Sequence, residues 1–269
     1  VRRSKVIDRD GVLSAENVYP KDEFLASTDE RFRPVDLKVG PDGGLYVVDM
    51  YRGIVQHKAF VTTFLRKQIL KRGLESPLGL GRIYRVLPTA AKRRPLPSLG
   101  SLDVAGLALA LEHPSGWCRD HAQRLLIGHG KSVIARITTV IESSRQPLAR
   151  LHALWVLEGV GGLRPSLLRL AMRDDHPQVR CAALRLSEPW LAGDPALRDQ
   201  VVGLVSDGDP RVVAQLALSL GVAPELARET MLPVLSRPSL PESLLAAILS
   251  GIPGQELEML EGLVAKKSF

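Results

Sequence analysis

The sequence has little cysteine and no long apolar run, and each shortage excludes a class of protein. Its two cysteines, Cys118 and Cys181, stand alone among helical residues without a CxxC or CxxCH spacing. This excludes attached c-type haem and argues against a zinc site, so no metal site is predicted. We expect both cysteines to be small buried side chains. No stretch approaches the roughly 18 apolar residues of a membrane span, so we expect a soluble chain without a membrane span.

Aromatic residues are scarce as well, at 4% of the 269 residues, and this bears on the net charge of +7. Residues 1–95 hold 19 Lys and Arg against 11 Asp and Glu, a net +8, whereas the remaining 174 residues hold 17 against 18, a net −1. A nucleic-acid binder needs a continuous basic stripe with interleaved aromatic side chains. The composition therefore argues against a nucleic-acid partner and favours solvated charge beside a domain boundary.

The N-terminus lacks the apolar stretch of a secretory leader. The chain opens on valine, and residues 1–14 (VRRSKVIDRDGVLS) are strongly charged. We expect an internal or C-terminal piece of a longer protein, so these residues do not indicate where the protein resides.

The densest run of strand, turn and helix signals lies within residues 24–88. Residues 35–39 alternate apolar and polar side chains, residues 41–44 (PDGG) form a turn, and residues 45–49 (LYVVD) return as a second strand. The pattern predicts an antiparallel β-hairpin. One end of this hairpin gathers five candidate functional residues: Arg33, Asp49, Tyr51, Arg52 and, a few residues on, His57.

The flanks of the hairpin extend the same unit. Residues 58–72 have apolar side chains at helical spacing and end at Gly73, which predicts a helix. Residues 81–87 alternate again and predict an outer strand, so we expect the helix to be an insertion packed against the sheet. Residues 1–13 predict one strand leading into a turn at Asp10-Gly11, with an exposed edge.

The rest of the chain changes character after residues 88–101, a proline-containing and basic linker that includes the triplet at 92–94. Residues 102–269 form a repeat array of about five helix pairs. Prolines that open every second helix recur at intervals of 33, 30, 33 and 31 residues, which is typical of an α-solenoid of HEAT type: Pro114, Pro147, Pro177, Pro210 and Pro241. The turns at residues 175–180 and 207–212 each place an acidic residue to cap the next helix.

Three stretches carry a resemblance to a known family: FLASTDERFRP, GPDGGLYVVDMYRGIVQHK and LGRIYRV. They resemble the end of the propeller domain of the "membrane-bound dehydrogenase" proteins of planctomycete and verrucomicrobial type. The similarity is dense over residues 20–87 and weaker up to about residue 160. That domain looks like the six-bladed propeller of sorbosone and glucose dehydrogenases, which use pyrroloquinoline quinone. The family follows it with HEAT-like repeats and often with a c-type cytochrome.

The resemblance predicts a mixed, mostly α fold: the last part of a β-propeller at residues 1–87, the linker at 88–101 and a HEAT-type solenoid at 102–269. It implies a quinoprotein sugar or alcohol dehydrogenase, located in the periplasm or at the cell surface, with pyrroloquinoline quinone and calcium bound by the longer protein. A propeller site is assembled from several blades and roughly one is present here. We therefore expect this chain alone to bind no cofactor and to lack a complete catalytic apparatus.

Each candidate site residue has two readings. His57 is a general base or an anchor for the loop before the helix. Arg33 holds a cofactor carboxylate or pairs with Asp49 across the hairpin end. Asp49 and Tyr51, together with Arg52, line a channel mouth or form a turn. For the other histidines we expect structural or solvated roles: His113, His121, His129, His152 and His176.

Two functions fit the sequence. In one, the chain is the C-terminal part of a dehydrogenase-like protein whose solenoid positions an electron-carrier domain or another protein partner. In the other, it is a non-catalytic HEAT-repeat interaction module capped by the propeller remnant. A nucleic-acid-binding HEAT protein is a third reading, and the neutral charge of the helical half argues against it.

Overall fold

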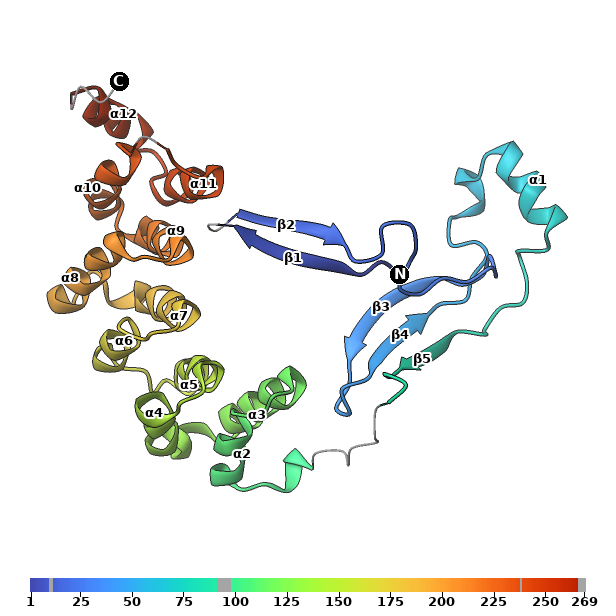
Figure 1. Ribbon diagram of the computed structural model, residues 1–269, viewed down its shortest axis with the longest axis horizontal. Helices are drawn as coiled ribbons and strands as arrows, with labels where there is room; N and C mark the ends of the chain where they lie inside the picture. The colour runs from blue at the N-terminus through green and yellow to red at the C-terminus, as the bar shows by residue number, and fades with distance from the viewer. Residues whose placement is uncertain (10–11, 91–97, 238, 266–269) are drawn as a thin grey trace. The chain divides into compact units, whose positions relative to one another are not determined.

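The computed structural model is mostly helical, with two small antiparallel sheets (Figure 1). It describes residues 1–269 except 10–11, 91–97, 238 and 266–269. The predicted turn at Asp10-Gly11 and residues 91–97 of the predicted linker, which include the basic triplet at 92–94, lie outside the described residues.

The chain divides into two compact units. Residues 1–6 and 15–98 form the first, the sheet unit, and residues 7–14 and 99–269 form the second, the helical unit. No helix in the described part of the chain has the length and apolar character needed to cross a membrane.

The N-terminal segment contains two strands where one was predicted. β1 (Ser4–Arg9) and β2 (Val12–Asn17) form a two-stranded sheet. β1 agrees with the predicted strand, whereas the return strand over residues 12–17 was not predicted. Their sequence, VLSAEN, lacks the regular alternation that signals a strand.

The predicted hairpin is confirmed. β3 (Pro34–Val39) pairs antiparallel with β4 (Leu45–Asp49), which pairs in turn with β5 (Arg82–Val86). Asp42 fixes the turn, since its Oδ1 accepts the Gly44 N–H at 2.9 Å and its other oxygen accepts the Tyr46 hydroxyl at 3.2 Å. β5 lies at the edge of this sheet, beside β4, as predicted for the outer strand.

The helix between β4 and β5 does not pack against the sheet, so that prediction was wrong. α1 (Thr63–Lys71) has no buried residue, and its Phe64 side chain is 69% exposed. The physical reason lies in the segment after α1, which polar contacts tie to residues 29–31. The Arg31 guanidinium donates to the carbonyl oxygens of Gly73 and Ser76, at 2.8 and 2.9 Å. The helix also begins later than predicted, at the Thr62 N-cap, after a short 3-10 turn at Lys58–Phe60.

The helical unit contains the eleven remaining α-helices of the described residues. Proline opens six of them at the first helical position, where its missing N–H costs no hydrogen bond. The helices are α2 (Val104–Ala110), α3 (Gly116–Gly128), α4 (Ile134–Ser143), α5 (Pro147–Gly159), α6 (Pro165–Ala171), α7 (Pro177–Ser187), α8 (Pro195–Gly203), α9 (Pro210–Ser219), α10 (Pro224–Leu235), α11 (Glu242–Gly251) and α12 (Glu256–Ala265).

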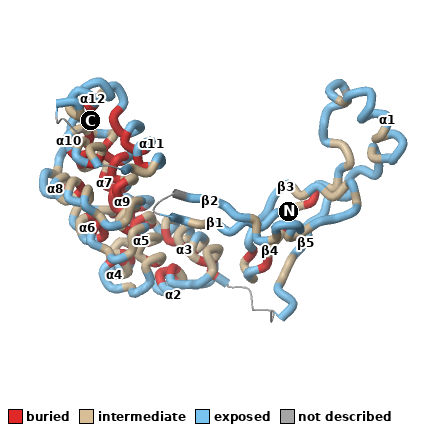
Figure 2. Tube along the Cα trace, turned by 45° about the horizontal axis from the view of Figure 1, so that its top comes forward, coloured by how far each residue is buried: buried red, intermediate tan, exposed pale blue. Residues whose placement is uncertain are grey.

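These helices stack in two rows (Figure 1). In the inner row each odd-numbered helix from α3 to α11 contacts the next odd-numbered one, and the outer row holds the even-numbered helices. Side chains between the rows form one continuous core that runs from Leu99 to Met259. Buried residues gather in the helical unit in Figure 2, whereas Val47 is the one buried hydrophobic side chain among the described residues of the sheet unit. The two units thus differ sharply in how much apolar surface they bury.

The predicted helix starts are partly confirmed. Pro147, Pro177 and Pro210 occupy the first turns of α5, α7 and α9. Pro114 and Pro241 do not, because Ser115 and Pro241 itself are the N-cap residues of α3 and α11.

Acidic capping is confirmed at one turn and wrong at the other. Asp209 accepts the Arg211 N–H at the start of α9. Asp175 caps nothing, because the N-cap of α7 is His176 and the carboxylate that accepts the His176 N–H, at 2.8 Å, belongs to Asp174.

Candidate functional site

Asp49 organises the end of the hairpin where the candidate residues gather. Its side chain is 1% exposed, and Oδ1 accepts the backbone N–H groups of Arg33 at 2.7 Å and of Tyr51 at 2.8 Å. Oδ2 is buried and has no hydrogen-bond partner among the described residues. The Asp49 carboxylate thus joins the start of β3 to the residue that follows the end of β4. This agrees with the turn-forming reading of Asp49.

Arg33 lies beside Asp49 without forming an ion pair with it. Its backbone N–H meets the carboxylate, while its guanidinium donates to the carbonyl oxygen of Arg52 at 3.0 Å and to that of Gly53 at 3.5 Å. The predicted side-chain pairing of Arg33 with Asp49 is therefore wrong. The strand direction brought the two residues together as predicted, but the guanidinium braces the loop after β4 instead.

Tyr51 adopts a left-handed backbone conformation, with φ of 48°, which is uncommon for a residue with a side chain. Its hydroxyl donates to Asp29 Oδ2 at 2.7 Å, and the Arg82 guanidinium lies 3.8 Å above its ring. Hydrogen bonds from the Arg31 N–H and from Tyr51 lower the pKa of Asp29, and the bond with Asp29 raises the pKa of Tyr51. Tyr51 is thus held by ring and hydroxyl contacts that sequence analysis missed, since Asp29 and Arg82 are distant along the chain.

His57 stands apart from this cluster. Its Nδ1 accepts the Ala59 N–H at 3.3 Å, and its ring makes an edge contact with Phe60, with centroids 6.1 Å apart. No hydrogen bond or ring contact within the described ranges connects His57 to Arg33, Asp49 or Tyr51. This is the geometry of a loop anchor before α1.

The hairpin end does not fit pyrroloquinoline quinone. The Arg33 guanidinium and the Tyr51 hydroxyl are engaged within the chain, and Asp49 is enclosed. Of the five candidates only Arg52 has an exposed side chain without a contact in the part of the chain that the structure describes. The same part contains no group of three or more His, Cys, Asp or Glu placed to hold a metal ion.

A feature that the sequence analysis missed lies in the helical unit. Arg150 of α5 and Asp174, ahead of α7, form a two-pronged ion pair with contacts of 2.5 and 2.7 Å. Arg180 of α7 repeats this pair with Asp207, ahead of α9, with both contacts at 2.7 Å. Each arginine stands three residues after a helix-opening proline and each aspartate three residues before the next one, so the spacing carried the signal.

These ion pairs are nearly enclosed. The side chains are 16% exposed at Arg150 and 8% at Asp174, and 15% at Arg180 and 7% at Asp207. Burial raises the pKa of Asp174, but hydrogen bonds from Arg150 and from the His176 N–H outweigh it, and the net shift is downward. The two pairs fasten α5 to α7 and α7 to α9 at equivalent positions.

Both cysteines and two of the six histidines, His121 and His152, lie within helices. Both cysteines are free thiols; Cys118 is buried as predicted, and Cys181 is half-buried, where burial raises its thiol pKa to about 11. This disfavours a reactive thiolate at neutral pH. His113 bonds the Ser115 N–H and His121 contacts the Trp117 carbonyl and ring, both nearby in the sequence, whereas His152 of α5 bonds Gln123 of α3.

Residues 1–90 match a family that is described as "Domain of unknown function (DUF7133)". The match ends close to β5, so it covers most of the sheet unit and none of the helices from α2 to α12. No curated protein matches the chain.

Proposed function

We propose that the helical unit is a HEAT-type α-solenoid that serves as a docking scaffold for a protein partner. The observation that carries the proposal is the repeated ion pair, Arg150 with Asp174 and Arg180 with Asp207, joining equivalent positions of successive inner helices. Together with helix pairs at a period of 30 to 33 residues, this supports an array in which each repeat contacts its neighbours. Such arrays present extended surfaces, and binding is their usual task.

We further propose that residues 1–87 are the closing part of a β-propeller of the dehydrogenase kind. The three-stranded sheet has an apolar face whose Leu37, Val39 and Tyr84 are 41%, 56% and 37% exposed. A small sheet with one buried hydrophobic side chain is poorly stabilised alone. A propeller blade has neighbouring blades to cover such a face, and this supports the resemblance to the quinoprotein dehydrogenases.

On this proposal the oxidoreductase site lies in other blades of a longer protein, and this chain contributes structure and docking. The enclosed state of Asp49 and the engaged state of Arg33 and Tyr51 support that division of labour. The alternative is a HEAT-repeat interaction module with no redox role, in which the sheet unit is only an N-terminal cap.

Calorimetric titration with pyrroloquinoline quinone in the presence of calcium separates these two readings. The experiment compares this chain with the full-length protein from which it comes. We expect the quinone to bind the full-length protein and not the chain alone. Absence of binding to the full-length protein would refute the dehydrogenase reading and leave the docking scaffold, which photo-cross-linking from the inner row tests independently.

A further inference from the structure

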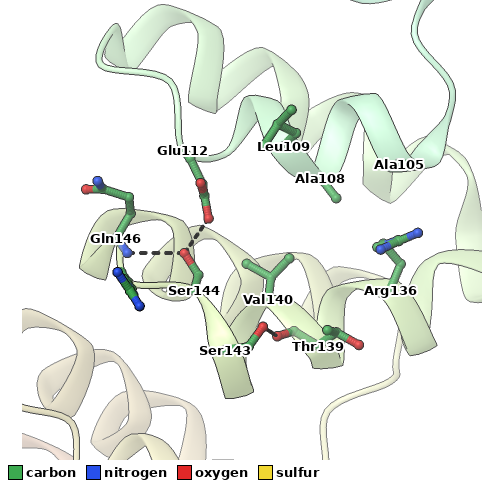
Figure 3. Close-up of a pocket in the computed structure, with 11 residues that line it drawn as sticks. Ala105, Ala108, Leu109, Glu112, Arg136, Thr139, Val140, Ser143, Ser144 and Gln146 are labelled. Carbon is green, nitrogen blue, oxygen red and sulfur yellow. Dashed lines mark hydrogen bonds between the residues drawn. The ribbon is translucent and has the colours of Figure 1, made fainter.

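The outer row of the helical unit contains a groove of about 700 Å³ between α2 and α4 (Figure 3). Apolar side chains from both helices line its middle, among them Ala108, Val140 and Leu109, and Leu109 is 69% exposed. An apolar side chain of a partner would remove this surface from water.

Basic side chains line the same groove. Arg136 belongs to α4 and Arg145 lies just beyond its end; both are exposed, and neither forms an ion pair or hydrogen bond in the described part of the chain. Glu112 is the one carboxylate among the lining residues, and it accepts the Ser144 hydroxyl at 2.6 Å. The groove therefore combines an apolar middle with two arginines that form no ion pair within the described residues, against one carboxylate.

The wider charge distribution points the same way. Residues 129–173 hold seven Lys and Arg against two Asp and Glu. Arg150 and Arg169 have acidic partners, Asp174 and Asp194. The near-neutral total of the helical half conceals this locally basic segment, which runs from the end of α3 to just beyond α6.

We infer that the groove between α2 and α4 binds an acidic segment of a partner protein, with carboxylates on either side of an apolar side chain. This inference rests on the proposed docking role of the helical unit and assigns that role a site and a partner chemistry. The carboxylates would meet Arg136 and Arg145, and the apolar side chain would cover Leu109 and Val140. Charge complementarity of this kind sets specificity and association rate.

The helix geometry sets the spacing of the carboxylates. Arg136 and the end of α4 at Ser143 are seven residues apart, which is about 10 Å at 1.5 Å per residue, and Arg145 lies beyond that end. An extended peptide rises about 3.3 Å per residue. Acidic residues three to five positions apart in an extended segment therefore match the two arginines.

A nucleic acid is the other polyanion that a basic groove could attract. It fits less well, because the groove has an apolar middle and no aromatic side chain lines it. A phosphate backbone makes no use of an apolar surface, and stacked bases need aromatic side chains.

Fluorescence anisotropy with a defined peptide pool tests the inference on the whole chain. Each labelled peptide carries two glutamate pairs that flank leucines, and the pool varies the separation of the pairs from two to six residues. We expect at least one peptide to bind and the matching glutamine version to bind at least tenfold more weakly. Affinity should fall as salt rises, since the arginines are exposed.

Two charge-reversal variants localise the binding. Arg136→Glu combined with Arg145→Glu should weaken the peptide at least tenfold. Arg173→Glu is the control, because Arg173 is exposed, lies outside the groove and forms no ion pair with any residue that the structure describes; it should change affinity less than twofold. Circular dichroism before and after the substitutions shows whether each variant is folded.

Three results would overturn the inference: no peptide of the pool binds, the double variant binds as tightly as the original chain, or a single-stranded oligonucleotide binds and displaces the peptide. In the first two cases the docking scaffold still stands if inner-row positions cross-link to a partner. The failure of the groove is thereby distinguishable from the failure of the scaffold.

Discussion

Replacing Arg150 with alanine will lower the free energy of unfolding of the helical unit by about 3 kcal/mol, because it leaves the carboxylate of Asp174 nearly buried without its counter-charge. The Asp174 side chain would keep one hydrogen bond, from the His176 N–H. Urea unfolding followed by circular dichroism at 222 nm measures the change.

Two further variants separate the ion pair from a general effect of losing an arginine. Arg185→Ala is the matched control, because Arg185 lies on the neighbouring helix α7 but its side chain is 61% exposed, with its guanidinium 3.5 Å from the Glu188 carboxylate. We expect this variant to lose less than about 0.5 kcal/mol of the free energy of unfolding. Arg150→Met combined with Asp174→Leu should be less damaging than Arg150→Ala alone, because no charge is left unpaired. Equal losses for Arg150→Ala and Arg185→Ala would contradict the structural role of the pair.

The same pair predicts how stability depends on pH. The pKa of Asp174 is lower in the folded chain than in the unfolded chain. Its contribution is therefore present above the unfolded pKa of about 4 and is lost as pH falls through the folded pKa. Arg150→Ala should flatten the loss of stability below pH 4, and unfolding curves at pH 6 and pH 3 compare the two chains.

Replacing Gly251 with alanine is expected to cost about 3 kcal/mol through overpacking. A Cβ at this position would lie 2.1 Å from the Ala217 carbonyl oxygen of α9, which belongs to the backbone and cannot rotate away. Gly251 ends α11, so the added methyl group would force α11 off α9. Thermal and urea unfolding of Gly251→Ala both measure the effect.

Gly203→Ala is the control for Gly251→Ala. Gly203 ends α8, and a Cβ there would have no neighbour within 4 Å. Alanine at this position should leave stability unchanged or raise it by up to about 1 kcal/mol, through its better helix propensity and a less flexible unfolded chain. A Gly251→Ala variant as stable as Gly203→Ala would show that α9 and α11 do not approach as closely as described.

Periodicity predicted the elements that have a regular pattern. The alternation over residues 35–39 and 45–49 predicted the hairpin, and the proline spacing predicted the helix pairs. Both patterns are regular because a buried face requires apolar side chains at a fixed spacing. The antiparallel pairing predicted from this alternation also placed Arg33 and Asp49 at the same end of the hairpin, where the structure has them. Local sequence could not say that the Arg33 guanidinium meets the carbonyl oxygens of Arg52 and Gly53, since that depends on the path of the loop.

Long-range contacts account for most of what the sequence did not predict. α1 has the apolar spacing of a packed helix, yet none of its residues is buried. Hydrogen bonds from Arg31 to the carbonyl oxygens of Gly73 and Ser76 hold the segment that follows α1. The ion pairs of Arg150 and Arg180 span about one repeat each and lie at constant offsets from the prolines. Their offsets were readable in the sequence, whereas the bidentate geometry and the burial that give them energetic weight were not.

Site-specific photo-cross-linking tests the docking scaffold most directly. Benzoylphenylalanine replaces one exposed leucine at a time in the full-length protein, expressed in its native cells: Leu218 of α9 and Leu249 of α11 in the inner row, Leu109 of α2 and Leu170 of α6 in the outer row. The account predicts a discrete adduct with the same identified protein or electron-carrier domain from some of these positions and not from others. No discrete adduct from any position, or equal diffuse adducts from all of them, would contradict it.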